Sequence, residues 1–147
     1  MTVPVTPRPA TPTPAAAKPR PVPTPTSQPF WDALRDERIS MQRCGACNGW
    51  VHYPRTRCSH CLSDRLSWHE LAGTGIVYTF SVARQPTTPQ FLDETPQVIA
   101  VVELDDGPRV TTTIVGVDAD DVKVGQRVRA VFDHGDDGIT LLRFEPL

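Results

Sequence analysis

The chain has 147 residues, of which 16 are proline, and a formal net charge of −2 at pH 7. No stretch approaches the roughly 18 consecutive apolar residues of a membrane span, and the N-terminus lacks the apolar segment of a secretory signal, so we expect a cytoplasmic protein. The net charge is +2 over residues 30–84 and −7 over residues 85–147, which disfavours nucleic acid as the main partner because phosphate-binding surfaces carry a basic excess.

Proline is concentrated at the N-terminus, where residues 1–29 hold ten of the 16 prolines and no aromatic residue. Proline has no amide donor, and a segment this poor in apolar side chains cannot offset its chain entropy by burial. We therefore expect residues 1–28 to form a disordered tail or linker of polyproline type, extended at about 3 Å per residue. Deleting residues 2–26 should then leave the thermal midpoint nearly unchanged. A docking peptide for a proline-recognition module is the alternative.

A short helix is predicted directly after the tail. Ser27 followed by Pro29 is typical of a helix start, because proline is tolerated in the first turn. Phe30 and Leu34 lie four positions apart with charged residues nearby, which predicts an amphipathic helix of about ten residues. Its leading aromatic pair, Phe30 and Trp31, either packs on the chain's own domain or docks into a partner.

All four cysteines lie within one 18-residue window, in the spacing C-x2-C-x10-C-x2-C. They are Cys44, Cys47, Cys58 and Cys61. Each C-x2-C pair can turn two sulfurs toward one point, and four thiolates at about 2.3 Å satisfy tetrahedral zinc. Because four thiolates leave no open position for water, the expected role of the metal is folding. We expect one structural zinc per chain.

Other interpretations of the cysteines differ in their chemistry. A four-sulfur iron site has the same spacing, so the sequence favours zinc without excluding iron. Disulfides need an oxidising compartment, and no secretion signal supports one. His52 and His60 lie close to the cysteines in sequence, but four thiolates already complete a metal shell, so neither histidine is expected to be a ligand.

From residue 74 onward the periodicity is that of strands. Five segments are rich in β-branched and aromatic residues and are separated by turn residues: 74–82, 97–104, 109–117, 126–132 and 138–144. Five short strands without a long helix between them predict a closed barrel of the OB type rather than a β-sandwich, which usually has more strands. The predicted fold is mainly β, divided into a tail (1–28), a helix and lead-in (29–43), a zinc ribbon (44–66) and an OB-fold barrel (67–147).

One connection, residues 84–96, is longer than a simple turn, and a connection of this length in a compact barrel is often functional. Aromatic and apolar residues outside the strands are favoured at the centres of interfaces. We therefore expect ligand or partner contacts from Phe30, Trp31, Arg84, Phe91 and Leu92, with Arg84 facing a phosphate. No nucleophile elbow, P-loop or zinc-protease motif occurs, so no catalysis by the chain alone is expected.

The order of a Phe-Trp helix, a four-cysteine ribbon and an acidic five-stranded barrel resembles that of the DUF35 family. This family comprises small proteins with a rubredoxin-like zinc ribbon and an OB fold, associated with acyl-CoA metabolism. The matching segments are PFWDALRDERISMQRCGAC, YPRTRCSHC, TGIVYTFSV, VIAVVELDDGPR and VGVDADDVKVGQRV, within residues 29–147. The proline-rich tail has no counterpart in the family pattern.

The resemblance implies a non-catalytic accessory subunit of a thiolase-like enzyme, such as a thiolase, a lipid-transfer-type thiolase or an aldolase that cleaves steroid side-chain CoA thioesters. It also implies a hot-dog-fold enoyl-CoA hydratase as an alternative partner, acyl-CoA at a shared site, and the four cysteines as zinc ligands. The rival interpretation is a nucleic-acid-binding OB module. In that module Tyr78 and Phe80, two positions apart on the first barrel strand, would share one face and stack on bases.

Overall fold

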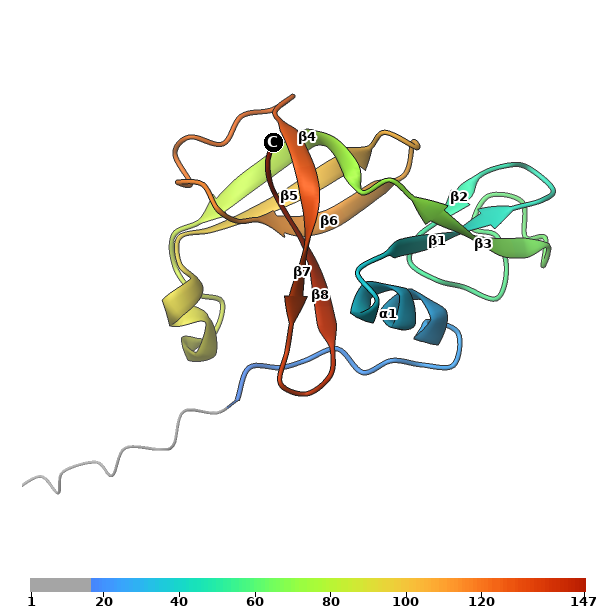
Figure 1. Cartoon of the computed structure of the whole chain (residues 1–147), viewed down its shortest axis with the longest axis horizontal. Coiled ribbons are helices and arrows are strands. Elements are labelled where there is room, and N and C mark those ends of the chain that lie inside the picture. The colour runs from blue at the N-terminus through green and yellow to red at the C-terminus, as the bar shows by residue number, and fades with distance from the viewer. Residues whose placement is uncertain (1–16) are drawn as a thin grey trace, which may run out of the picture.

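The computed structural model describes residues 17–147, so the first 16 residues of the predicted tail lie outside the described part. Within that part the chain is mainly β, as the sequence predicts (Figure 1). In chain order the elements are α1 (Gln28–Arg35), β1 (Ile39–Cys44), β2 (Trp50–Val51), β3 (Leu66–Leu71), β4 (Thr74–Ala83), the 3-10 helix η1 (Pro89–Glu94), β5 (Gln97–Leu104), β6 (Arg109–Ile114), β7 (Arg127–His134) and β8 (Thr140–Pro146).

Helix α1 is shorter than the ten residues that the sequence predicts, because its C-terminus closes early. Glu37 adopts a left-handed conformation with φ of 56°, and the Arg38 N–H donates to the Ala33 carbonyl at 2.9 Å. This arrangement is a Schellman motif, which satisfies the last carbonyls of a helix and ends it. The apolar face of α1 buries Phe30 and Leu34 beside β1, β7 and β8.

A three-stranded antiparallel sheet in the order β2–β1–β3 carries the ribbon. The longest pairing joins β1 to β3, from Ile39 opposite Leu71 to Cys44 opposite Leu66. The sequence does not predict β3, because its segment LSWHEL contains no β-branched residue and its partner strand lies far earlier in the chain. The expected division between residues 66 and 67 therefore falls inside a strand of the ribbon sheet.

The predicted OB-type barrel is confirmed: five strands close in the order β4–β5–β6–β8–β7, with β7 pairing back onto β4. All neighbouring pairs are antiparallel except β6 and β8, which run parallel. Gly75 on β4 makes this closure possible, since it pairs with both Leu104 on β5 and Val128 on β7. A Cβ at this position would lie 3.0 Å from the Leu104 Cα, which leaves room only for glycine.

One core joins the helix, the base of the ribbon sheet and the barrel. Its fully buried side chains include Phe144 from β8, Leu34 from α1 and Met41 from β1. The Trp50 indole N–H donates to the Asp106 carbonyl at 3.1 Å, which ties the ribbon to the β5–β6 turn. The ribbon itself has a separate, much smaller cluster with three buried members, Cys44, Val51 and Cys58.

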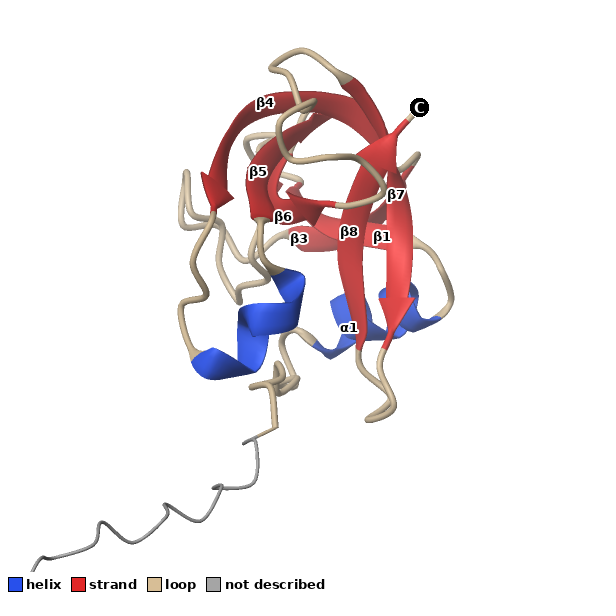
Figure 2. Cartoon of the chain, turned by 90° about the vertical axis from the view of Figure 1, so that its left-hand side faces the viewer, coloured by secondary structure: helices blue, strands red, loops and turns tan. Residues whose placement is uncertain are grey.

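The described end of the tail runs from residue 17 past the β7–β8 hairpin to α1 (Figure 1). Helices α1 and η1 lie at the same end of the barrel, and the tail passes this end (Figure 2). Lys18 and Arg20 form ion pairs with acidic side chains there. The sequence predicts a tail without packed contacts, so it does not indicate these ion pairs. Their acidic partners lie far from the tail in the sequence. Within residues 17–147, no helix has the length and apolar character needed to cross a membrane.

Candidate metal centre and aromatic groove

Two tight turns of the ribbon present the four cysteines. In the first, the Asn48 N–H donates to the carbonyl of Cys44 at 2.9 Å, and in the second the Leu62 N–H donates to the carbonyl of Cys58 at 3.0 Å. Asn48 and Leu62 both adopt left-handed conformations, with φ of 59° and 61°. Each turn thus reverses the chain directly after its second cysteine, and both sulfurs of the pair face the same side.

The four sulfurs converge on one point. All Sγ atoms lie within 4.8 Å of one another, and the Cys44–Cys61 and Cys47–Cys58 Sγ pairs are each 3.6 Å apart. A tetrahedron with four Zn–S bonds of about 2.3 Å has S–S edges of about 3.8 Å, so the observed spacing fits zinc at its centre. No disulfide joins the cysteines, and they form the structural zinc site that the sequence predicts.

Backbone amides favour the thiolate form of Cys44. The pKa of Cys44 is lowered to about 6, mainly by the backbone N–H groups of Cys47 and Ala46. The backbone nitrogen of Ala46 lies 3.3 Å from Cys44 Sγ, and the backbone nitrogen of His60 lies at the same distance from Cys58 Sγ. Such donors offset part of the negative charge that four thiolates concentrate around a divalent ion.

Neither nearby histidine joins the metal site. His60 Nε2 donates to the Trp50 carbonyl at 3.1 Å. His52 faces the helix instead, with its ring centroid 5.6 Å from that of Phe30. Burial lowers the pKa of His52 to about 4, and its Nδ1 has no hydrogen-bond partner among the described residues. In residues 17–147 the four cysteines are the only cluster of His, Cys, Asp or Glu side chains arranged around a metal position.

A groove with a cavity volume of about 530 Å³ lies between α1, η1 and strands β6 and β8. We call it the aromatic groove, after Phe30, Trp31, Tyr53 and Phe91 in its walls. It brings together three of the five predicted contact residues, Phe30, Trp31 and Phe91. Phe30 is buried, and its ring meets that of Trp31 edge to face at a centroid distance of 5.2 Å. The Trp31 side chain therefore packs against a buried ring of the core.

The other two predicted contact residues lie outside the groove walls. Leu92 is 66% exposed in η1 and presents its side chain to solvent. Arg84 forms an ion pair with Asp120, and both side chains are largely exposed. A phosphate that binds this guanidinium would therefore compete with Asp120 for it.

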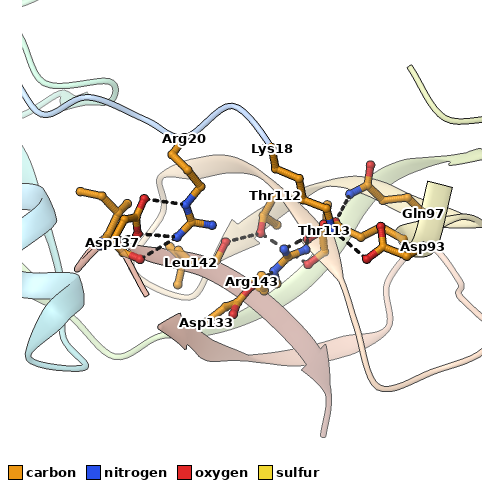
Figure 3. A network of polar contacts seen from close by, with 12 residues as sticks. Lys18, Arg20, Asp93, Gln97, Thr112, Thr113, Asp133, Asp137, Leu142 and Arg143 are labelled. Atoms are coloured by element: carbon orange, nitrogen blue, oxygen red, sulfur yellow. Dashed lines mark hydrogen bonds and ion pairs between the residues drawn. The ribbon is translucent and has the colours of Figure 1, made fainter. Parts of the chain in front are cut away.

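The polar base of the groove is not evident from the sequence. The Arg143 guanidinium on β8 donates to Asp133 Oδ2 at 2.8 Å and to Thr113 Oγ1 at 3.0 Å (Figure 3). The Thr112 hydroxyl donates to the Leu142 carbonyl at 2.9 Å. The only sequence signal for this polar base is an arginine inside the strand pattern TLLRFEP. Its partners come from β6 and β7, so the sequence does not indicate which residues it contacts.

The stacking surface expected of a nucleic-acid module is not formed on β4. A β-bulge between Val77 and Thr79 shifts the register of the strand, so Tyr78 and Phe80 do not share a face. Tyr78 is 46% exposed, and the Arg109 guanidinium lies 3.6 Å from its ring centroid. Phe80 packs against the barrel core instead.

Two family models match adjoining parts of this chain. The rubredoxin-like zinc ribbon domain of ChsH2 matches residues 31–67, and the C-terminal OB-fold domain of ChsH2 matches residues 68–133. The first matched region covers the ribbon with the later part of α1 and the start of β3, and the second covers the rest of β3 and the barrel from β4 into β7.

Curated relatives include both a longer and a similarly sized protein. The chain is 40% identical over 118 residues to a probable enoyl-CoA hydratase alpha subunit of Thermomonospora curvata, a match that covers 80% of this chain and 36% of that protein. It is 36% identical over 113 residues to a DUF35 domain-containing scaffold protein of Methanothermobacter thermautotrophicus, covering 73% of this chain and 84% of that protein. The chain thus spans about a third of the hydratase subunit and most of the scaffold protein.

Solved structures show the same arrangement of ribbon and barrel. A chain of the Ltp2-ChsH2(DUF35) aldolase is 37% identical and has a TM-score of 0.76, covering 86% of this chain and 98% of that chain. A DUF35 protein of unknown function from Sulfolobus solfataricus shares the fold, with a TM-score of 0.60 at 18% identity. The extent of these matches, together with the converging cysteines, shows that this chain belongs to the DUF35 family.

Proposed function

We propose that this protein is a non-catalytic accessory subunit of a thiolase-like enzyme that acts on acyl-CoA. The observation that carries the proposal is the likeness to the DUF35 chain of an aldolase, which extends over 98% of that chain. The metal site supports a structural role, because four thiolates leave no coordination position for an activated water. An aldolase acting on steroid side-chain CoA thioesters is the partner class that the family resemblance implies.

The proposed contact surface is formed by the rim of the aromatic groove and by η1. Leu92 is 66% exposed and Trp31 is half-buried, so both offer apolar area to a partner without unfolding of the domain. Phe30 holds Trp31 in place, and Phe91 lies between the groove and the exposed face of η1. Acyl-CoA would bind where the two proteins meet, with a CoA phosphate replacing Asp120 beside Arg84.

Co-expression with a thiolase-like protein tests the assembly. Leu92→Glu and Trp31→Ala should each weaken the complex by about tenfold or more, as measured by isothermal titration calorimetry. Val124→Glu is the matched control, because Val124 is also 66% exposed but lies outside the groove and η1. Assembly that is equally insensitive to all three changes would contradict the proposed surface.

The role of Arg84 has a separate readout. Arg84→Glu should lower the acyl-CoA-dependent turnover of the assembled complex while leaving assembly itself intact, because the residue is exposed and paired only at the surface. Failure to assemble with any thiolase-like protein, together with binding of single-stranded nucleic acid at physiological salt, would overturn the proposed function as a whole.

An enoyl-CoA hydratase of the hot-dog fold is a second candidate partner. The observation in its favour is the 40% identity to a protein named as a hydratase alpha subunit. The two candidates differ in the reaction of the purified complex. An aldolase complex cleaves a carbon–carbon bond of its acyl-CoA, whereas a hydratase complex adds water across a double bond, and product analysis by mass spectrometry separates the two.

A further inference from the structure

Residues 18–23 of the proline-rich segment form a strap whose Pro19, Pro21 and Val22 line the aromatic groove. Figure 3 shows Lys18 and Arg20 of this strap reaching acidic side chains at its two ends. At one end of the strap, the Lys18 ammonium lies 3.0 Å from Asp93 Oδ2 and 2.7 Å from Glu94 Oε1, both in η1. These carboxylates raise the pKa of Lys18 above its ordinary value. The strap is therefore anchored to the loop that joins the first two barrel strands.

The second anchor is on the β7–β8 hairpin. Arg20 donates through Nε to Asp137 Oδ2 at 3.0 Å and through Nη2 to the Ile139 carbonyl at 2.9 Å. The Asp137 carboxylate also accepts the Ile139 N–H at 3.1 Å, which holds it in position for the guanidinium. Gly135 leaves the space that the guanidinium occupies, since a Cβ there would collide with Arg20. Hairpin and strap thus fit each other in shape as well as in charge.

The exposure of the strap follows the geometry of a polyproline helix. Between Lys18 and Pro23 only Pro19 and Val22 are exposed, three positions apart, while the other residues are half-buried. A polyproline II helix has three residues per turn, so one of its faces points to solvent and two face the protein. Alternate prolines already fix much of this conformation, which lowers the entropy lost when the strap docks.

The groove has the features that recognise such a helix. Trp31, Tyr53 and Phe91 line it together with Pro19 and Pro21 of the strap, and the Lys18 ammonium lies 5.8 Å from the centroid of the Phe91 ring. Aromatic-lined grooves bind polyproline segments because they accept a preformed helix with little loss of entropy. Carboxylates at both ends add a preference for basic residues next to the prolines.

We propose that the surface formed by η1, the β7–β8 hairpin and the adjoining aromatic groove recognises an extended, basic, proline-rich segment, and that residues 18–23 are its occupant in the free protein, where they form one wall of the groove. This inference goes beyond the proposed function and does not depend on it. The strap is tethered to α1, so its effective concentration at the groove is in the mM range, and it competes with any segment supplied in trans. The anchoring ion pairs are partly exposed, so salt weakens the occupied state.

The test uses the full chain and a fluorescent peptide of the sequence AKPRPVPTP, residues 17–25. In the variant Lys18→Glu/Arg20→Glu, the reversed charges meet the carboxylates of η1 and the hairpin and release the strap. We expect this variant to bind the peptide at least about tenfold more tightly than the wild type, as measured by fluorescence anisotropy at low salt. Binding should weaken as the salt concentration rises.

Two controls make the result specific. Arg65→Glu/Lys123→Glu changes the net charge equally at exposed positions outside the groove, and it should bind the peptide no better than the wild type. A peptide with glutamate in place of its lysine and arginine should not bind the strap-released variant. Equal peptide binding by the wild type and the strap-released variant, or no binding by a strap-released variant with an intact circular dichroism spectrum, would overturn the proposal.

Discussion

The zinc ribbon and the barrel share one chain, but different forces hold them together. In the barrel, the strands enclose apolar side chains that have no exposed surface, among them Val77, Val102, Val128 and Phe144. In the ribbon, residues 45–65 contribute only two buried side chains, Val51 and Cys58. Burying a valine or a phenylalanine stabilises a fold by about 1.5–3 kcal/mol, so the ribbon cannot offset its chain entropy in this way.

A single ion replaces the missing core of the ribbon. Zinc bound to four thiolates contributes about 10–16 kcal/mol in small zinc domains, comparable to several buried side chains. The ribbon should therefore unfold as a whole when its metal is lost. In the barrel, each core substitution should lower the free energy of unfolding by a limited amount. Variants in each region can separate the two modes.

The largest effect is expected at the metal. Cys58→Ser removes a fully buried ligand and should abolish stoichiometric zinc binding, with loss of most of the roughly 10–16 kcal/mol. Elemental analysis and a 1H–15N NMR spectrum of the purified protein measure both consequences. The exposed neighbour Ser59 gives the control, because Ser59→Ala should keep one zinc per chain. A folded ribbon with one bound zinc in the Cys58→Ser protein would contradict the dependence on four sulfurs.

A barrel substitution should act without affecting the metal. Phe144 on β8 has no exposed surface, so Phe144→Ala should lower the free energy of unfolding by about 3–5 kcal/mol through the cavity that it leaves. Zinc content should remain at one per chain, which distinguishes this loss from that of Cys58→Ser. Val124→Ala, at an exposed position, should change stability by about 0.5 kcal/mol or less in chemical denaturation. Loss of zinc from Phe144→Ala would show that the two regions are coupled.

The junction between the two regions predicts a pH effect. His52 packs beside Phe30, and burial lowers its pKa from 6.5 to about 4. Between these values the unfolded chain binds the proton and the folded chain does not, so stability falls as the pH drops from 6.5 to 4 and levels off below. By this linkage the total loss is at most about 3 kcal/mol.

Two variants isolate this titration from the release of zinc at low pH. His52→Phe keeps a ring in the contact with Phe30 but cannot bind a proton, so its stability should depend less on pH between 6.5 and 4. His69→Phe is the matched control at an exposed histidine and should follow the wild type. The same pH dependence in all three proteins, measured by thermal melting, would refute the role of His52.

The predictable features of the fold are those that local sequence determines. The cysteine spacing identifies the zinc site because each C-x2-C turn is a local structure. The five barrel strands lie close to the predicted ranges because β-branched runs alternate with turn residues such as Asp106 and Gly107. The family resemblance could be stated because these two signals occur in one order along the chain.

The missed features depend on contacts between distant parts of the chain. Strand β3 forms by pairing with β1, and Arg143 is held by residues from two other strands. A one-residue bulge moves Tyr78 away from the face of Phe80, although the alternation in the sequence places the two together. The ion pair between Arg84 and Asp120 also joins residues far apart in sequence, and the contact of Arg84 with a phosphate stays a prediction.

The smallest effect is expected at the tail, which belongs to neither the ribbon nor the barrel. The sequence predicts no loss of stability on deletion of residues 2–26, but the structure leads to a different expectation. The Thr24 carbonyl accepts the N–H groups of Ser27 and Gln28 at 3.0 and 2.8 Å, and the strap pairs with η1 and the hairpin. Deletion should therefore lower the thermal midpoint by roughly 2–5 °C.

Salt separates the two contributions to this loss. Lys18→Gln/Arg20→Gln keeps the Thr24 contacts and removes the partly exposed ion pairs together with the bond from Arg20 to the Ile139 carbonyl. Most of its smaller decrease should therefore disappear in about 0.5 M salt, where charges a few ångströms apart are screened. The deletion should keep part of its effect in the same salt, because its lost backbone hydrogen bonds do not depend on screening. A deletion variant that melts with the wild type at every salt concentration would restore the sequence-based view of a tail without packed contacts.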